Sequence, residues 1–304
     1  MNEIRERLVR EALFNHLNNL VEASVDGLLN WTQTDTFLFN REKFTIRQTR
    51  GRGINKPGNL DGALSITTAF TPFGQDPPYN DFVGADGFHR YKYEGTNPDL
   101  FTNKSLRLCM EFRLPLVYFV GVRHATYIPI FPTYIIGDDQ VNSEFLIGFS
   151  SSQIGIDLSK LSFLEKKYIL QESKKRVHQP IFRERVINAY LGECAVCHLK
   201  HVELLDAAHI ISDSKPHGEP IVPNGIALCK IHHAAYDKNF MGIDKNYKIV
   251  ISEKILYEVD GPMLKHGLQD MHGNMITIPS SLADRPDADR LEERFDEFRQ
   301  AASA

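Results

Sequence analysis

Two short stretches decide the fold of this chain: LLDAAHI at residues 204–210 and PNGIALCKIHHAAYD at residues 223–237. The first predicts an apolar strand that carries Asp206 and His209. A loop rich in proline and glycine follows it, and residues 223–225 are predicted to open a helix. The expected local order is therefore strand, loop, strand and helix.

Four potential metal ligands lie before the first stretch or within the second. Cys194 and Cys197 form a C-x-x-C pair, and Cys229 and His232 form a second pair one helical turn apart. Together they predict a tetrahedral Cys₃His site for a structural Zn²⁺. Since the gap between the pairs is longer than in a compact zinc finger, something is inserted there. The alternative is a set of unrelated buried cysteines, as is expected for Cys109 in its apolar surroundings.

The adjacent histidines of the second stretch need separate explanations. Neighbouring residues project about 100° apart from a helix, so His232 and His233 cannot easily serve one metal. His232 shares a face with Cys229 and is assigned to the zinc. His233 aligns with Asp237 one turn further on, which indicates a second site on the same helix. Three other histidines lack paired spacing and are expected on the surface: His198, His201 and His217.

Composition limits the class of protein. The chain has 304 residues, 42% of them apolar, and a net charge of −4, which is typical of a protein with two globular domains and does not by itself indicate a polyanion partner. No apolar run reaches the roughly 20 residues of a membrane span, and the longest run, around LPLVYFVGV, predicts a buried strand. The N-terminus predicts an amphipathic helix and no signal peptide, so we expect a cytoplasmic protein. In that compartment clustered cysteines indicate metal before disulfides.

The pattern of residue types along the chain changes twice. After an opening helix to about residue 30, short β-branched and aromatic runs between residues 36 and 149 predict an all-β sheet or barrel. Residues 158–191 are strongly helical with a break at Pro180. We therefore expect a first domain at 1–160, a helical linker at 161–182 and a second domain at 183–304, which ends in a charged helix.

The pattern between residues 183 and 251 resembles the HNH family of nucleases with its ββα-metal fold. This resemblance implies an endonuclease in which His209 is the general base, because a neutral imidazole accepts a proton near physiological pH. Asn224 resembles the family's central asparagine, whose side chain fixes the loop that orients the base; the alternative is a plain helix N-cap. Catalysis would also need a divalent cation, Mg²⁺ or Mn²⁺, on the developing charge.

The ligands of that cation follow from the resemblance with one departure. The family often has a metal ligand just before the catalytic histidine, where this chain has Ala208. Asp206 lies two positions earlier and therefore on the same face of the strand as Ala208. We assign Asp206 as the substitute ligand, together with His233 and Asp237.

A second resemblance covers about residues 50–137. Its shared features are Tyr79-x-Asp81, Asp86-Gly87, Tyr93-x-Gly95, Asn103-x-x-Leu106 and the strand LPLVYFVGV. They are similar to the SET- and RING-associated (SRA) fold, a β-barrel that reads modified cytosine in DNA. Since a base must be flipped out for inspection, Tyr79 and Tyr93 would sandwich its ring and Asp81 would accept from its amine. In the alternative, both tyrosines are ordinary barrel aromatics.

Phosphates would be held by a basic run between residues 41 and 56, which has six basic residues and one acid. The members assigned to DNA are Arg50, Arg52 and Lys56. Such a run can also be only a solvated face. It gains weight because the second domain gives an independent reason to expect DNA.

Together these patterns predict an α+β protein: an SRA-like β-barrel domain, a helical linker and a ββα-metal HNH domain with structural zinc. The predicted function is cleavage of double-stranded DNA that bears modified cytosine, by a homodimer, since one HNH centre cuts one strand. Two alternatives stay open. The first domain can sense another ligand, such as a nucleotide signal or DNA with other modifications, or the protein can be a non-catalytic zinc module that binds DNA.

Overall fold

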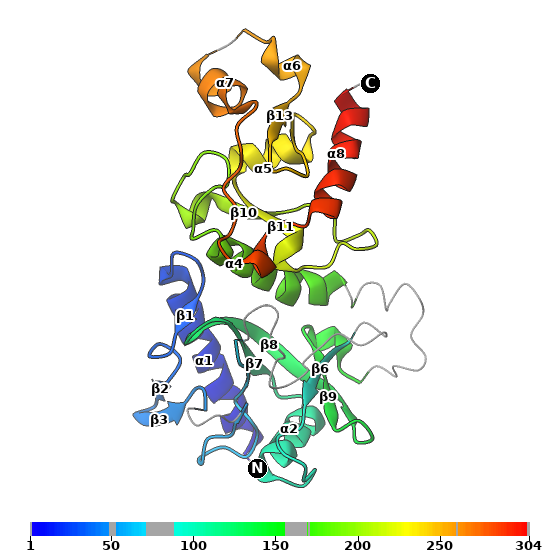
Figure 1. Cartoon of the computed structure of the whole chain (residues 1–304). Coiled ribbons are helices and arrows are strands. Elements are labelled where there is room, and N and C mark those ends of the chain that lie inside the picture. The colour runs from blue at the N-terminus through cyan, green and yellow to red at the C-terminus, as the bar shows by residue number, and fades with distance from the viewer. Residues whose placement is uncertain are drawn as a thin grey trace. The chain divides into compact units, whose positions relative to one another are not determined.

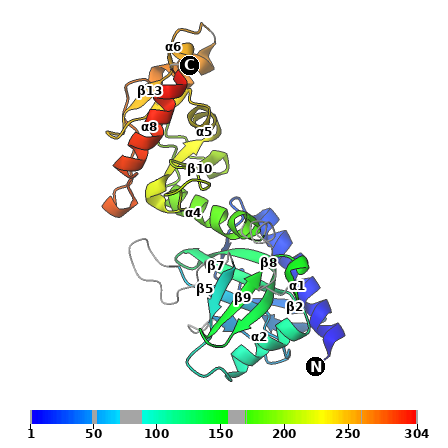
Figure 2. The ribbon, with the colours of Figure 1, turned by 90° about the vertical axis from the view of Figure 1, so that its right-hand side faces the viewer.

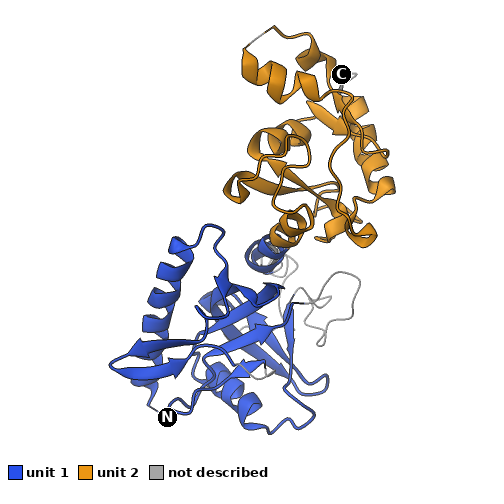
Figure 3. Cartoon of the chain, turned by 60° about the vertical axis from the view of Figure 1, so that its left-hand side comes forward, with its two compact units in different colours: residues 1–181 blue, residues 182–304 orange. Residues whose placement is uncertain are grey.

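The structure is a computed structural model that describes residues 2–48, 53–70, 88–155, 169, 171–259 and 261–302. Contacts divide the chain into two compact units, residues 1–181 and residues 182–304 (Figure 3). Four residues predicted to read DNA lie outside the described residues, Arg50, Arg52, Tyr79 and Asp81, as do Asp86 and Gly87 of the SRA-like pattern. None of the described helices combines the length and the apolar character that a membrane-spanning segment needs.

The first unit is built on a curled mixed sheet with a helix on each face (Figures 1 and 2). The sheet order is β4-β5-β7-β8-β9-β6, with β1 paired to β8 and with β2 and β3 forming a separate hairpin. Strands β5 and β7 run parallel, and the other pairs are antiparallel. The elements are α1 (Glu3–Ala23), β1 (Leu29–Asn30), β2 (Thr36–Phe39), β3 (Glu42–Thr45), β4 (Ile54–Asn55), β5 (Ser65–Thr68), β6 (His89–Lys92), α2 (Phe101–Glu111), β7 (Leu116–Arg123), β8 (Thr126–Asp139) and β9 (Glu144–Gly148).

Strand β7 shows why the run LPLVYFVGV is apolar at every position. Alternate side chains of a strand point to opposite faces of a sheet. Val117 and Phe119 pack with α1 in one core cluster, whereas Tyr118 and Val120 pack with α2 in another. Both faces of this strand are therefore covered, and the prediction of a buried strand is confirmed.

Two expectations for this unit need correction. Residues 36–149 are not all β, because α2 interrupts them at the segment that carries the Asn103-x-x-Leu106 feature. Leu106 and Cys109 lie one turn apart and face the sheet, while the opposite side of the helix is polar. The sheet also does not close as a barrel within the described residues, because its end strands β4 and β6 share no ladder.

The second unit contains the predicted strand, loop, strand and helix. Strands β10 and β11 form an antiparallel hairpin in which Leu205 pairs with Cys229 and His209 with Gly225, and α5 follows at once. The elements are α4 (Gln179–Ala189), β10 (Leu205–His209), β11 (Gly225–Cys229), α5 (Lys230–Asp237), β12 (Met241–Ile243), β13 (Ile249–Ile251), α6 (Glu253–Leu256), α7 (Pro262–Gly267) and α8 (Ala288–Ala302).

The start of α5 differs from the expectation. Residues 223–225 lead into β11 and not into the helix, and Cys229 is the N-cap residue of α5. The apolar run of β11 continues the strand up to Cys229 because all five of its residues are buried. The plain N-cap interpretation of Asn224 is therefore wrong.

Candidate functional site

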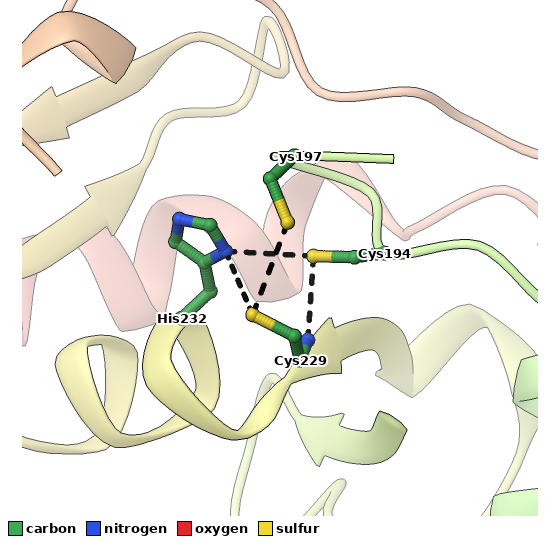
Figure 4. A group of neighbouring side chains, drawn as sticks. All are labelled: Cys194, Cys197, Cys229 and His232. Carbon is green, nitrogen blue, oxygen red and sulfur yellow. Dashed lines mark hydrogen bonds between the residues drawn. The ribbon is translucent and has the colours of Figure 1, made fainter. Parts of the chain in front are cut away.

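The four predicted zinc ligands converge in the second unit (Figure 4). Their ligand atoms all lie within 4.8 Å of one another, and they are the only such metal-ligating group among the described residues. Cys197 Sγ lies 3.9 Å from Cys229 Sγ, and Cys194 Sγ lies 3.5 Å from His232 Nδ1. A tetrahedral zinc with Zn–S bonds of about 2.3 Å gives sulfur–sulfur edges of about 3.8 Å. The spacing therefore fits a zinc ion.

The hydrogen bonds of His232 identify its ligand atom. His232 Nε2 lies 2.7 Å from the carbonyl oxygen of Gly267 in α7. A carbonyl can only accept, so Nε2 carries the ring proton and donates. In the neutral ring, Nδ1 then presents its lone pair to the sulfurs of Cys194 and Cys229. Such a second hydrogen bond is the usual way in which a protein orients a zinc-bound histidine.

Two of the three thiols depend on a cation for their charge, whereas the hydrogen bond with Cys229 lowers the pKa of Cys194. Burial raises the pKa of Cys197, and the hydrogen bond with Cys194 together with burial raises the pKa of Cys229 to about 11. Zn²⁺ reverses this tendency, because a coordinating thiol loses its proton. The cluster can therefore hold zinc at neutral pH.

A second group of polar side chains lies where α5 faces β10. His233 Nδ1 is 3.1 Å from Asp206 Oδ2, and His233 Nε2 is 3.4 Å from Asp237 Oδ2. Lys230 donates to the other oxygen of Asp206. Burial raises the pKa of Asp206, but the hydrogen bonds from Lys230 and His233 outweigh it, so this pKa lies below its ordinary value. The carboxylate is therefore ionised at neutral pH.

This group suits a divalent cation by its chemistry. Carboxylate oxygens are the ligands that Mg²⁺ or Mn²⁺ prefers, whereas an imidazole nitrogen favours transition metals. The two carboxylates approach different nitrogens of the His233 ring, so all three side chains do not yet point at one spot. The structure brings Asp206, His233 and Asp237 together, as the strand and helix periodicities predicted.

His209 lies on the other side of the hairpin. Its ring stacks on Phe182 of α4 with ring centroids 4.1 Å apart. Its ladder partner Gly225 faces the same helix, because a Cβ there would lie 2.4 Å from Val186 Cγ2. Only glycine allows α4 to approach so closely. By strand alternation, His209 and Asp206 project from opposite faces of β10.

Asn224 ties the loop after β10 to the start of β11. Its side chain is fully buried and accepts from the backbone N–H of Ile211 at 2.9 Å. Its amide donates to the carbonyls of Ile211 and Glu219 at 2.9 and 3.1 Å. Three bonds to the backbone fix this loop two residues beyond His209, which matches the loop-fixing role implied by the family resemblance.

The remaining predicted residues are spread over the chain. Tyr93 is only 5% exposed, its ring packs on Phe145, and its hydroxyl donates to Asp138, so a base cannot stack on it without repacking. Lys56 is half-buried with its Nζ 3.5 Å from the carbonyl of Pro57. The three histidines expected on the surface, His198, His201 and His217, are exposed there.

Three contributors to the site were not predicted from the sequence. They are Lys230 beside Asp206, Phe182 beneath His209 and the Gly267 carbonyl that orients His232. The position of Lys230 could have been inferred from the hairpin. Cys229 pairs with Leu205, so the next residue, Lys230, begins α5 close to Asp206. The other two depend on packing between elements far apart in the sequence.

Comparisons with known proteins agree with this geometry. Residues 194–244 match the model of a family described as HNH endonuclease, and the matched range contains all four zinc ligands as well as β10, β11 and α5. The comparison with curated proteins gave no match.

Two solved structures show partial similarity. "Modification dependent TagI restriction endonuclease" is 15% identical with a TM-score of 0.30, over 81% of this chain and 85% of that chain. The "Type IV phosphorothioation-dependent restriction endonuclease ScoMcrA" is 13% identical with a TM-score of 0.23. That match covers 83% of this chain and 53% of the other, so this chain spans about half of that protein.

Proposed function

We propose that the HNH endonuclease domain at residues 194–244 cleaves double-stranded DNA and that the first unit restricts cleavage to DNA with modified cytosine. One observation carries the nuclease: a ββα motif within the matched range presents His209, Asn224 and the Asp206–His233 pair around one hairpin. A non-catalytic zinc module would have no need of these groups beside the zinc ligands.

The chemistry assigns a role to each side chain. His209 takes a proton from the water that attacks the phosphorus, while the bond to the leaving oxygen breaks. Asn224 positions His209 through the loop at Ile211. Asp206, His233 and Asp237 would hold a single Mg²⁺ or Mn²⁺. When bound, this cation stabilises negative charge on the phosphate and the leaving oxygen.

The Cys₃His cluster is proposed to hold structural Zn²⁺ and to take no part in the reaction. Its ligands flank the hairpin and start α5, so the ion fixes both elements that carry the catalytic groups. A site with four protein ligands leaves no open position for a substrate.

The proposed specificity of the first unit is based on the resemblance of residues 50–137 to SRA domains. The proposed location of the protein is the cytoplasm, where its DNA substrate would be. The alternative is a first unit that senses a different ligand, such as a nucleotide signal or DNA with other modifications. Phosphates would be held by Arg50, Arg52 and Lys56.

A homodimer would let two centres cut the two strands. The exposed apolar side chains of Val259 and Met263, in the α6–α7 region, are candidate interface residues. Sedimentation that shows only monomer at micromolar concentration, while double-strand cleavage is first order in enzyme, would contradict the dimer.

Plasmid cleavage tests the function. Matched plasmids would carry plain, methylated, hydroxymethylated or glucosylated cytosine, or phosphorothioate linkages, and would be incubated with and without Mg²⁺ or Mn²⁺. We expect cleavage only with a divalent cation and only of plasmids with modified cytosine. His209→Ala should abolish cleavage because it removes the group assigned to take the proton of the water.

His201→Ala is the matched control, since His201 is an exposed histidine of the same domain and should leave cleavage unchanged. Equal cutting of all plasmids would remove the modified-cytosine specificity and keep the nuclease. Full cleavage by His209→Ala would remove the assigned base. No cleavage of any plasmid with either cation would favour the non-catalytic module.

A further inference from the structure

Trp31 is held in a fixed position at one end of the sheet in the first unit. It is the only tryptophan of the chain and is 37% exposed. It follows β1 in a turn that its neighbours lock: Asn30 Oδ1 accepts from the backbone N–H of Gln33 at 3.1 Å, and Gln33 Oε1 accepts from that of Asn30 at 2.9 Å. The indole is thus presented by a preorganised turn.

The inner face of this indole is covered by a cation. The guanidinium carbon of Arg47 lies 3.8 Å from the centre of the Trp31 ring and 4.3 Å from that of Tyr127. Arg47 is only 3% exposed, and its hydrogen bonds go to the neutral oxygens of Thr34 and Gln48. Since Arg47 seals one face, the exposed part of the indole belongs to its edge and outer face.

Charges of both signs lie near the indole. Asn30 pairs with Thr126, so the β7–β8 turn with Arg123 lies beside Trp31, and Arg123 Nη2 itself lies 3.9 Å from Asp26 Oδ2. Because these charges offset each other, the feature left for recognition is the flat outer face of the indole. Such a face suits another aromatic ring.

We propose that the outer face of Trp31 is a stacking platform for a nucleobase of the DNA that has left its base stack. This inference rests on the proposed function and deepens it, because it names a stacking residue of the reading unit that differs from the packed Tyr93. Bases inside a duplex are stacked on both sides, so the base must be extruded or single-stranded. Every base has a ring face, so Trp31 would stack without choosing the sequence.

Fluorescence of the full chain tests the contact without any substitution. Because Trp31 is the only tryptophan, the emission reports this site alone. The probes are a short duplex with one bulged cytosine and its fully paired twin, titrated without added divalent cation to prevent cleavage. We expect the bulged duplex to quench the emission and to protect it from iodide more than the paired duplex does.

Substitutions measured by anisotropy of labelled DNA give the second test. Trp31→Leu should weaken binding of the bulged duplex about five- to hundred-fold, the loss typical of one stacked base, and Trp31→Tyr should restore most of it. Leu38→Ala is the control, because Leu38 is a 73% exposed apolar residue of the next strand and should have no effect. Circular dichroism checks that each variant is folded.

The outcomes separate this inference from the function on which it rests. If DNA leaves the emission of Trp31 unchanged, or if folded Trp31→Leu binds the bulged duplex as tightly as the parent, the platform does not exist. Cleavage of plasmid by the parent chain would then show that the nuclease proposal still holds. If the parent chain neither binds nor cleaves any DNA, both proposals fail.

Discussion

Two adjacent histidines of α5 show how one residue position changes the role of a side chain. His232 is 2% exposed, its Nε2 donates to Gly267, and its Nδ1 faces three sulfurs. His233 is turned to the other group, where it lies between Asp206 and Asp237. The rotation of about 100° per helical residue thus separates a zinc ligand from a proposed catalytic ligand.

Metal analysis of purified variants tests this separation. His232→Ala should lower the zinc content, because it removes one of four ligands, whereas His233→Ala should keep zinc and weaken the response of cleavage to Mg²⁺ or Mn²⁺. His201→Ala, at an exposed histidine, should change neither. Loss of zinc from His233→Ala with full zinc in His232→Ala would reverse the assignment.

The spacing of residues along the sequence predicted which residues form the site, but it did not predict which side chains pack around them. The C-x-x-C and C-x-x-H pairs gave the cluster, and the periods of strand and helix brought Asp206 to His233. The stacking of His209 on Phe182 had no such signal, because it depends on how α4 packs on the hairpin. Local periodicity cannot supply that information.

At the scale of elements, α5 depends on α8. A helix of eight residues is marginal alone, and its last carbonyls need partners. Arg294 of α8 donates to the carbonyl of Tyr236 and to Oδ1 of Asn239, both at 2.6 Å, and its guanidinium lies 4.8 Å from the Tyr236 ring centre. The last turn of α5, which carries Asp237, is thus clamped from a helix beyond the family match.

Removing this clamp should weaken the nuclease. Arg294→Ala should destabilise the second unit by about 1–3 kcal/mol, the cost of leaving buried partners without a charged donor, and should lower cleavage. Denaturant unfolding and plasmid cleavage measure the two effects. Arg299→Ala, at an exposed arginine of the same helix, should change neither. Equal stability of Arg294→Ala and the parent would mean that the clamp contributes nothing.

The elements themselves were predicted unevenly. The ββα order, the buried β7 and the charged C-terminal helix follow from hydrophobic patterning and are confirmed. Helix α2 was missed because it lies among β-branched runs and its N-cap residue Leu100 makes no side-chain capping hydrogen bond, although its apolar residues have helical spacing. The parallel pairing of β5 with β7 was not predicted either, since register between distant strands leaves no local trace.

At the scale of the molecule, each unit is one continuous stretch with its own core. The first unit buries both faces of its sheet beneath helices and has no metal-ligating cluster among its described residues. The second unit includes the cysteines of the zinc cluster in its core. The second unit should therefore need a metal to stay folded.

A chelator should unfold one unit and leave the other. Tryptophan emission reports the first unit alone, because Trp31 is the only tryptophan, whereas far-ultraviolet circular dichroism reports both units. In circular dichroism, a strong zinc chelator should remove the thermal unfolding transition of the second unit and leave that of the first. Added Zn²⁺ should restore the lost transition. An equal shift of the emission transition would contradict the independence of the units.

The clamp from α8 also sets an order of events during protein synthesis. A ribosome releases the chain from its N-terminus, so Arg294 emerges after every residue of the β10–β11–α5 motif. A chain that is interrupted after residue 244 has the Cys₃His cluster and the proposed catalytic groups, yet lacks the Arg294 contacts to the last turn of α5. The proposed nuclease should therefore be less active in such a truncated product than in the finished chain.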